Sequence, residues 1–283
     1  MTSIAPSATT FLVQLTDTHI REPGRLAYGR IDTAPYLRRA VASVRALRQR
    51  PDAVVITGDL SDFGRPAEYV HLAELLAPLD DLPVYLLPGN HDDRDALRRG
   101  FPGHGYLGAP GGFIQYSVPV GGLRLVALDT TTPGQPHGEL CAERLAWLAA
   151  ELDRRTGQPV VVAMHHPPFD TLIGHMDRIG LREGAPALEA LVRRHPNVER
   201  LICGHLHRAI EARFGGSIAC TAPGPAHQVA LDLRPDAASQ WVLEPTGFRV
   251  HALPAGGRMV SHLAAAGDFE GPYPFHDAGG LID

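Results

Sequence analysis

The sequence predicts an α/β fold, and three observations lead to this class. Short apolar runs of strand length, several of them rich in β-branched residues, recur along the chain. Helical patterns of apolar residues lie between several of these runs. Each run is followed by a turn that contains glycine or histidine. Strands that alternate with helices are typical of sheets with much parallel pairing.

The expected elements follow one another in a regular order. Strands are predicted where the short apolar runs occur, at 11–15, 53–57, 84–87, 123–128, 160–164, 201–203 and 217–220. Helices are predicted where apolar residues recur with helical spacing, at 34–49, 66–78, 139–154 and 184–194. We expect loops at 100–122, which is rich in glycine and proline, and at the irregular stretch 166–182.

The character of the chain changes near residue 223. Three further strands are expected at 226–233, 240–244 and 247–253, and the tail at 254–283 shows no clear periodicity. The interpretation is a core at 10–222 followed by a β-rich C-terminal extension at 223–283, a candidate cap or dimer contact. The first eight residues are expected to be disordered.

Composition narrows the class of protein. The chain has 283 residues, 44% of them hydrophobic, which is enough for one large core. Its net charge is −5 and its basic residues are all arginine, without a basic stripe, so neither a nucleic acid polymer nor a membrane surface is an expected partner. Three cysteines without a C-x-x-C pair, no signal peptide and no membrane-length apolar run indicate a cytoplasmic protein.

Potential metal ligands follow five of the predicted strands. They are Asp17 and His19 after the first, Asp59 after the second, Asn90 after the third, His165 after the strand at 160–164, and His205 and His207 after the strand at 201–203. Functional sites assemble at the carboxyl ends of strands in open α/β sheets. Glycine before Asp59, Asn90 and His205 allows a sharp turn close to a crowded centre.

The spacing and number of these residues favour two metal ions. D-x-H and H-x-H place two side chains on the same side of an extended segment. Seven ligands are too many for one four-coordinate zinc ion, but they suit two ions that share a carboxylate. Imidazole and oxygen ligands without thiolate fit Fe, Mn, Zn or Co. Each dipeptide alone is also a common turn sequence, so the prediction rests on five of them occurring at strand ends.

These residues resemble the signature of the calcineurin-like metallophosphoesterases, D-x-H, G-D, G-N-H-[DE], H and G-H-x-H, in that order. The stretches "RPDAVVITGDL" at 50–60, "GNHDDRDALR" at 89–98 and "MHHPP" at 164–168 are similar to bacterial class III cyclic-nucleotide phosphodiesterases and the related glycerophosphodiesterase. The resemblance covers about 11–233 well and the tail only loosely. It implies a four-layer αββα sandwich, two facing sheets with helices outside.

The resemblance also implies two ligand sets that share the Asp59 carboxylate. Metal 1 would be held by Asp17, His19, Asp59 and His207, and metal 2 by Asp59, Asn90, His165 and His205. A hydroxide would be the second bridge, and its attack on phosphorus would hydrolyse a phosphodiester directly. Two divalent or trivalent ions outweigh the charge of the two aspartates and the hydroxide. They therefore supply the positive field for a phosphodiester anion that the net charge of the chain does not.

His91 is the predicted general acid, because it lies one residue beyond a ligand and should face the substrate. The alternative is that it only hydrogen-bonds the substrate phosphate. Several other residues receive an interpretation. His227 and Arg208 are candidate substrate contacts, Asp62 a partner of a ligand histidine or a turn residue, and Asp92 or Asp93 a helix cap; His166 is expected to be structural, and His104, His137, His175 and His195 to be loop or surface residues.

The predicted function is a dinuclear-metal phosphodiesterase for small phosphodiesters, such as cyclic AMP and other 3′,5′-cyclic nucleotides, or glycerophosphodiesters. A homo-oligomer is expected. A phosphomonoesterase of the same fold is the alternative. A non-catalytic scaffold is disfavoured because all seven ligand positions are filled. A DNA-repair nuclease is disfavoured because the sequence has no evident basic surface for DNA.

Overall fold

The computed structural model describes residues 9–278 and 280–282, so the expected disorder of the first eight residues lies outside the described part. Its first sheet has the order β15-β14-β1-β2-β3. The strands of this sheet are β1 (Thr10–Leu15), β2 (Ala53–Thr57), β3 (Val84–Leu87), β14 (Gly247–Leu253) and β15 (Val260–Ala265). β1, β2 and β3 are parallel, β14 is antiparallel to β1, and β15 is antiparallel to β14.

The second sheet has the order β10-β11-β9-β7-β5-β4. Its strands are β4 (Tyr116–Val120), β5 (Leu123–Leu128), β7 (Val160–Met164), β9 (Val198–Cys203), β10 (Glu211–Phe214) and β11 (Ser217–Thr221). The four central strands are parallel and the two edge strands are antiparallel. Short two-stranded pairs join β6 (Gly138–Glu139) to β8 (Leu181–Glu183), β12 (Gln228–Val229) to β13 (Trp241–Val242) and β16 (His276–Asp277) to β17 (Gly280–Leu281).

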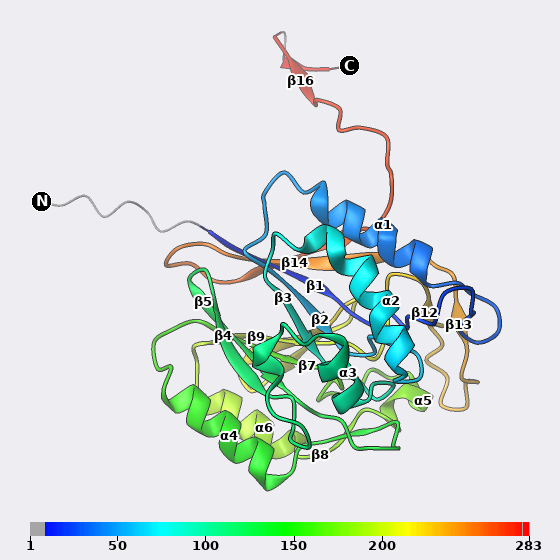
Figure 1. Cartoon of the computed structure of the whole chain (residues 1–283). Helices are drawn as coiled ribbons and strands as arrows, with labels where there is room; N and C mark the ends of the chain where they lie inside the picture. The colour runs from blue at the N-terminus through cyan, green and yellow to red at the C-terminus, as the bar shows by residue number, and fades with distance from the viewer. Residues whose placement is uncertain (1–8, 279, 283) are drawn as a thin grey trace, which may run out of the picture.

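Helices cover the outer faces of both sheets, which gives four layers (Figure 1). The helices are α1 (Ala34–Arg45), α2 (Pro66–Leu76), α3 (Arg94–Gly100), α4 (Ala142–Asp153), α5 (Gly174–Asp177) and α6 (Ala185–Arg194), with 3₁₀ turns η1 (Ala77–Leu79) and η2 (Gly105–Leu107). Among the residues that the structure describes, no helix has the length and apolar character needed to cross a membrane.

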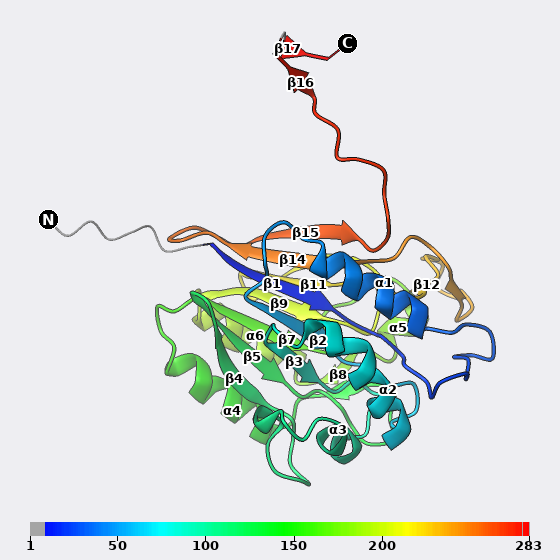
Figure 2. The same ribbon diagram turned by 45° about the horizontal axis from the view of Figure 1, so that its top comes forward.

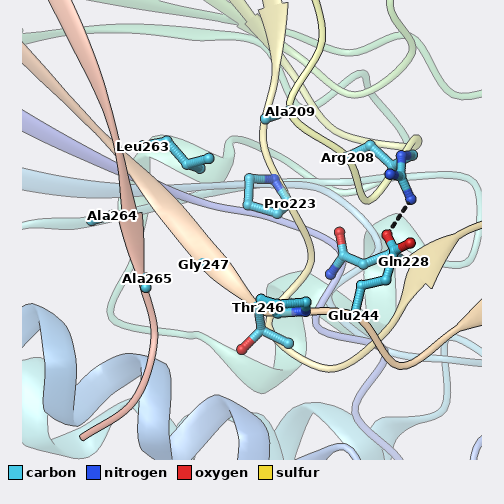
Figure 3. A pocket seen from close by; sticks show the side chains of 11 residues that line it. Arg208, Ala209, Pro223, Gln228, Glu244, Thr246, Gly247, Leu263, Ala264 and Ala265 are labelled. Atoms are coloured by element: carbon cyan, nitrogen blue, oxygen red, sulfur yellow. Dashed lines mark hydrogen bonds and ion pairs between the residues drawn. The ribbon is translucent and has the colours of Figure 1, made fainter. Parts of the chain in front are cut away.

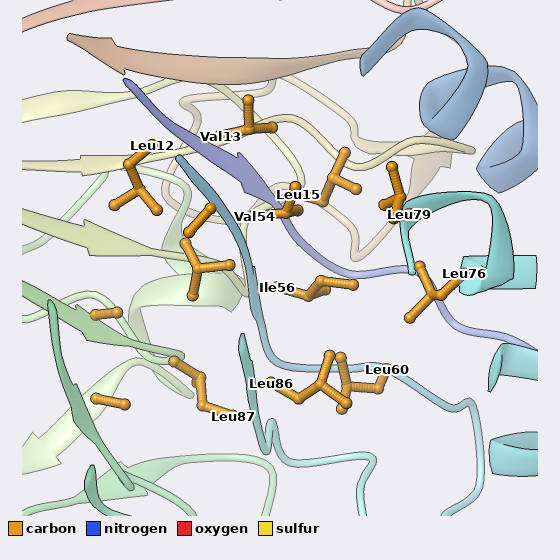
Figure 4. Close-up of a cluster of buried hydrophobic side chains, with 14 of the residues drawn as sticks. Leu12, Val13, Leu15, Val54, Ile56, Leu60, Leu76, Leu79, Leu86 and Leu87 are labelled. Carbon is orange, nitrogen blue, oxygen red and sulfur yellow. The ribbon is translucent and has the colours of Figure 1, made fainter. Parts of the chain in front are cut away.

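Two apolar clusters hold the layers together because strand side chains alternate between the faces of a sheet. Leu125 of β5 belongs to the larger cluster, which fills the space between the sheets and the space beneath α1 and α2. Its neighbour Val126 belongs to the cluster beneath α4 and α6. Figure 4 shows the larger cluster around β1, β2 and β3. The strands are therefore buried on both faces, which explains why they are apolar runs in the sequence.

The predicted elements are mostly confirmed. All seven strands expected before residue 223 and the strand at 247–253 are present, as are the four helices with slightly shorter bounds. The strands expected at 226–233 and 240–244 are present only as the two-residue strands β12 and β13, which pair with each other, so their predicted bounds were too long. The expected loop at 100–122 also contains η2 and β4, the expected loop at 166–182 contains α5 and the start of β8, and the tail contains β15.

The C-terminal segment is built into the first sheet. β14 pairs with β1 and β15 pairs with β14, so both strands come from beyond residue 223. After β15, the chain leaves the body as an extended arm that ends in the β16–β17 pair (Figures 1 and 2). Four large apolar side chains of this arm are more than 60% exposed, at Phe269, Tyr273, Phe275 and Leu281. The division at residue 222 and the role as cap or dimer contact stay predictions.

Candidate metal centre

Five strands deliver the predicted ligands to one place. β1, β2 and β3 of the first sheet end just before Asp17, Asp59 and Asn90, and β7 and β9 of the second sheet end just before His165 and His205. A cavity of about 250 Å³ opens at this edge and is lined by several of the predicted residues, namely His19, Asp59, Asn90, His91, His205, His207 and His227. The site therefore lies where the two sheets meet.

The backbone at the centre is conformationally unusual. Five of the predicted ligands have a positive φ, with values of 53° at Asp17, 44° at His19, 48° at Asp59, 71° at His205 and 49° at His207. A non-glycine residue in this region costs about 1–3 kcal/mol, and such residues cluster at functional sites. The surrounding fold therefore forces these side chains inward against the preference of their own backbone.

Close packing explains two of the glycines. A Cβ at Gly89 would lie 2.2 Å from Oδ1 of Asp59, and a Cβ at Gly204 would lie 2.2 Å from Oγ1 of Thr16. Neither atom can move without disturbing the centre. The glycines before Asn90 and His205 are thus required by close approach, as the sequence predicted.

Four donor atoms of the first predicted ligand set converge. Nε2 of His19 lies 3.2 Å from Nε2 of His207 and 3.6 Å from Oδ2 of Asp59. Nε2 of His207 lies 3.5 Å from Oδ1 of Asp17. All four side chains are almost completely buried.

The second predicted set converges on the other side of Asp59. Nε2 of His165 lies 3.4 Å from Oδ2 of Asp59, 3.1 Å from Oδ1 of Asn90 and 3.3 Å from Nδ1 of His205. The same Asp59 oxygen therefore faces both groups. His91 donates its backbone N–H to the other oxygen, Oδ1, at 2.9 Å.

Outer hydrogen bonds determine which ring nitrogens carry a proton. Nδ1 of His19 donates to the Asp62 carboxylate (3.1 Å), and Nδ1 of His207 donates to the carbonyl of His227 (3.1 Å). Nδ1 of His165 donates to the carbonyl of Thr57 (2.9 Å). In a neutral imidazole the other nitrogen then has a lone pair.

Acceptors consequently face acceptors at the centre. The lone pairs of His19 and His207 point at each other, and the lone pair of His165 faces the oxygens of Asn90 and Asp59. Such contacts repel unless positive charge lies between them, supplied by a proton or a metal ion. The donor set fits metal ions, because it combines imidazole nitrogen with carboxylate and amide oxygen.

The pKa values reflect the same demand for positive charge. Burial lowers the pKa of His165, but the charges of Asp59 and Asp17 outweigh it and raise the pKa to about 9. Burial, with the neighbouring Asp59 adding to it, raises the pKa of Asp17 to about 6. Burial lowers the pKa of His205 to about 3, with the nearby His165 acting in the same direction. The protonation of each of these buried carboxylates and imidazoles thus depends on the charge of its neighbours.

Two residues that are not predicted ligands hold the loops of the centre. The Asp62 carboxylate accepts the hydrogen bond from Nδ1 of His19, which is one of the two roles expected for it from the sequence. Asp92 accepts from the backbone N–H groups of Gly89, Leu60 and Ser61, all at 2.9–3.0 Å, so it fastens the Asp59 loop to the Asn90 loop. No pattern in the sequence predicts this link, because it depends on how two loops pack against each other.

The predicted helix cap is confirmed at Asp93, whose side chain accepts from the backbone N–H of Ala96 at the start of α3. His166 is buried, bonded through Nδ1 to the hydroxyl of Thr130 and through Nε2 to the carbonyl of Pro136. This arrangement agrees with the structural role expected for it.

His91 and His227 both line the cavity. Nδ1 of His91 donates to the carbonyl of Asp62 at 2.8 Å, which leaves Nε2 as the nitrogen for a substrate. His227 is 2% exposed, and its Nδ1 has no hydrogen-bond partner among the described residues. Its ring lies 4.4 Å from that of His207 and 5.4 Å from that of His19.

Arg208 lies elsewhere, although it follows a predicted ligand. It forms an ion pair with Glu244 (2.6 Å) and donates to the carbonyl of Val229 (2.7 Å). Figure 3 shows this pair in a different pocket, which residues of β14 and β15 also line. The structure therefore does not bring Arg208 to the cavity with the other predicted site residues.

Some residues of the cavity wall were not predicted from the sequence. His175, expected to be a loop or surface residue, is a buried residue of α5 that lines the cavity, so that expectation was wrong. His195 is also buried, at the end of α6, with a bond to Asp153. Tyr28 and Trp241 form an aromatic wall with ring centroids 5.6 Å apart.

Comparison with known proteins identifies the class. The family model of the calcineurin-like phosphoesterases matches residues 12–209, and the chain belongs to this family. A probable glycerophosphodiester phosphodiesterase GpdQ of Arcobacter nitrofigilis is 36% identical over 96% of this chain and 99% of the relative. A probable cyclic nucleotide phosphodiesterase of Rhodopseudomonas palustris is 37% identical over 94% of this chain and 96% of the relative.

A third relative is the 3′,5′-cyclic adenosine monophosphate phosphodiesterase CpdA of Pseudomonas aeruginosa, 31% identical over 93% of each chain. Among solved structures, a dimetal phosphatase from Danio rerio matches with a TM-score of 0.60 at 18% identity, over 92% of this chain and 100% of that one. The purple acid phosphatase PPD1 of yellow lupin matches with a TM-score of 0.66 at 15% identity, over 92% and 52%. At these identities the structural likeness supports the fold alone.

Proposed function

We propose that the protein is a two-metal phosphodiesterase for small phosphodiesters. The observation that carries the proposal is the convergence of His19, His165 and His207 lone pairs with the Asp59 carboxylate at the edge where the two sheets meet. Relatives of similar length whose names are phosphodiesterases support it.

The chain offers one ligand set for each ion, with Asp59 common to both. The proposed sets are Asp17, His19, Asp59 and His207 for metal 1, and Asp59, Asn90, His165 and His205 for metal 2. Fe, Mn, Zn or Co suit these nitrogen and oxygen donors. When bound, two such ions stabilise the charge of the phosphate and lower the pKa of the water molecule that attacks phosphorus.

His91 is proposed as the general acid. Its Nδ1–H bond to the Asp62 carbonyl orients the ring, so that Nε2 can carry a proton to the leaving oxygen as the bond from phosphorus to that oxygen breaks. The leaving oxygen thereby becomes a neutral hydroxyl group, on a separate alcohol for a glycerophosphodiester and on the same molecule for a cyclic nucleotide. His227, with its buried Nδ1 free of partners among the described residues, is a proposed contact for a phosphate or leaving-group hydroxyl.

The substrate class remains a pair of candidates, 3′,5′-cyclic nucleotides and glycerophosphodiesters, because relatives of both names match along nearly the whole chain. The decisive experiment is a substrate panel with Mn²⁺ that compares 3′,5′-cyclic AMP, glycerophosphoethanolamine, bis(p-nitrophenyl) phosphate and p-nitrophenyl phosphate. We expect hydrolysis of the diesters. If only the monoester turned over, the protein would be a phosphomonoesterase. A cytoplasmic location and a homo-oligomeric state are part of the proposal.

A further inference from the structure

Gln14 of β1 is a polar residue at a core position. It is 0% exposed and lies on the face of the first sheet that meets the second sheet. A buried amide of this kind is costly unless its donors and acceptor are satisfied. All of them are satisfied here, and the partners come from both sheets.

The direction of every hydrogen bond follows from the partners. Nε2 of Gln14 donates to the carbonyl of Cys203 (2.8 Å) and to Oγ1 of Thr57 (3.0 Å). Oε1 accepts from Nε2 of His251 (3.1 Å), so Nδ1 of His251 accepts from the hydroxyl of Ser261 (2.7 Å). The Cys203 carbonyl can only accept, so the amide has one possible orientation, and His251 holds the amide oxygen in it.

Its two acceptors have a special position in the chain. Cys203 lies two residues before His205, and Thr57 lies two residues before Asp59. The carbonyl of Thr57 also accepts from Nδ1 of His165 (2.9 Å). Gln14 itself lies three residues before Asp17. One side chain therefore ties together strand ends that deliver ligands from the first sheet and from the second.

We propose that Gln14, oriented by His251, is a positioning residue that sets the distance between the two halves of the metal centre. The inference rests on the proposed function. A bridged pair of ions needs ligands from both sheets at fixed separations, and residues that orient ligands typically affect metal affinity by about 10- to 100-fold. Without the amide, the Cys203 carbonyl keeps only the longer bond from the backbone N–H of Ala222 (3.3 Å), and the side-chain link from β1 to the end of β9 is lost.

The test is metal affinity in the full-length protein. Gln14→Leu removes the three hydrogen bonds at similar size, and Gln14→Glu keeps the shape but removes both amide hydrogens. Tyr116→Phe is the matched control, because it also removes a buried hydrogen bond between the sheets, from its hydroxyl to the carbonyl of Leu86 (2.9 Å). No proposed ligand lies two residues after Leu86.

Mn²⁺ binding is measured by equilibrium dialysis with elemental analysis, and unfolding of the metal-free proteins by circular dichroism. We expect both Gln14 variants to weaken Mn²⁺ binding by about 10- to 100-fold. Tyr116→Phe should lower Tm without changing the affinity for Mn²⁺. If Gln14→Leu does not fold, Gln14→Glu gives the same readout.

Two results would overturn the inference: wild-type affinity in a folded Gln14 variant, or an equal loss of affinity in Tyr116→Phe. The second result would mean that any loosening between the sheets weakens the centre. Failure of the proposed function has a different signature, because the wild-type protein would then bind no Mn²⁺ and hydrolyse no phosphodiester.

Discussion

Single hydrogen bonds on the outer ring nitrogens decide the chemistry of the centre. Asp62 and the carbonyls of Thr57 and His227 each accept a hydrogen bond from one imidazole Nδ1–H. The nitrogens that face inward are therefore ready to bind cations, and no rearrangement of the rings is needed. Such outer partners raise the basicity of ligand histidines and fix their orientation.

Replacing the proposed acid should separate catalysis from metal binding. His91→Ala should lower kcat by about 10²- to 10⁴-fold, because the leaving alkoxide would lose its proton donor. Metal content, measured by elemental analysis, should stay at the wild-type value. His137→Ala is the control, since this histidine is outside the residues that line the cavity. Loss of metal in His91→Ala would instead make His91 a ligand.

The ligand residues could be predicted from the sequence because each follows a buried strand. The carboxyl ends of parallel strands lie at the same edge of a sheet, so residues that follow them come together. The failures have local causes. Arg208 follows His207, but the positive φ of His207 turns the chain, and Arg208 pairs with Glu244 instead. His175 reaches the cavity from α5, a four-residue helix that no periodicity marks, and the strand predicted around Trp241 gave no indication of which side chain would face the cavity. Asp92 acts through contacts between two loops, which spacing along one strand does not reveal.

At the scale of elements, apolar runs predicted the strands correctly where other layers of the fold cover both faces of the sheet. β2 is buried at all five positions, and its apolar sequence AVVIT predicts a strand over its full length. The stretch 226–233 has apolar residues too, but only Gln228 and Val229 pair with the strand β13. β15 was missed because its side chains are largely exposed and its pairing depends on β14, which precedes it.

The β14–β15 hairpin should make the fold sensitive to acid. Burial lowers the pKa of His251 from 6.5 to about 3, and Arg249 and Arg200 add to the effect. Below pH 6.5 the unfolded chain binds a proton at this residue that the folded protein does not. Stability should therefore fall by about 1.4 kcal/mol per pH unit from this residue as the pH drops from 6.5 toward 3.

His251→Gln isolates this contribution, because glutamine does not titrate and can still donate to Gln14. Urea unfolding at pH 7, 6 and 5 gives the free energy of unfolding for both proteins. The wild-type protein should lose more stability between pH 6 and 5 than the variant does. Identical pH dependence in the two proteins would contradict a buried neutral His251.

For the whole molecule, metal removal should be destabilising. Asp17 and Asp59 are buried side by side, and inward lone pairs face one another, so the metal-free centre is repulsive. A ligand that binds only the folded state at about 1,000 times its Kd contributes about 4 kcal/mol. Chelation should therefore lower Tm, and Mn²⁺ should restore it. An unchanged Tm after measured loss of metal would exclude this coupling.

The exposed arm bears on the predicted homo-oligomer. Several large apolar side chains exposed on one extended segment suit a contact with another protein chain. We expect light scattering to give the full chain a mass above the 30.5 kDa of one copy. Serine at Phe269, Tyr273 and Phe275 together should shift the mass toward one copy. A wild-type monomer, or an unchanged mass in the variant, would contradict a role of the arm in assembly.

The place of β14 has a consequence for how the protein is made. β1 emerges from the ribosome long before its neighbour in the sheet, β14, does. Until residues 247–253 have emerged, β1 is an edge strand, and Gln14 lacks its bond from His251, 237 residues away in the chain. A chain that stops before β14 can therefore bring β1, β2 and β3 together, but only a chain that includes β14 has the bond from His251 to the Gln14 amide. Synthesis thus delays a fully positioned centre until the sheet is closed.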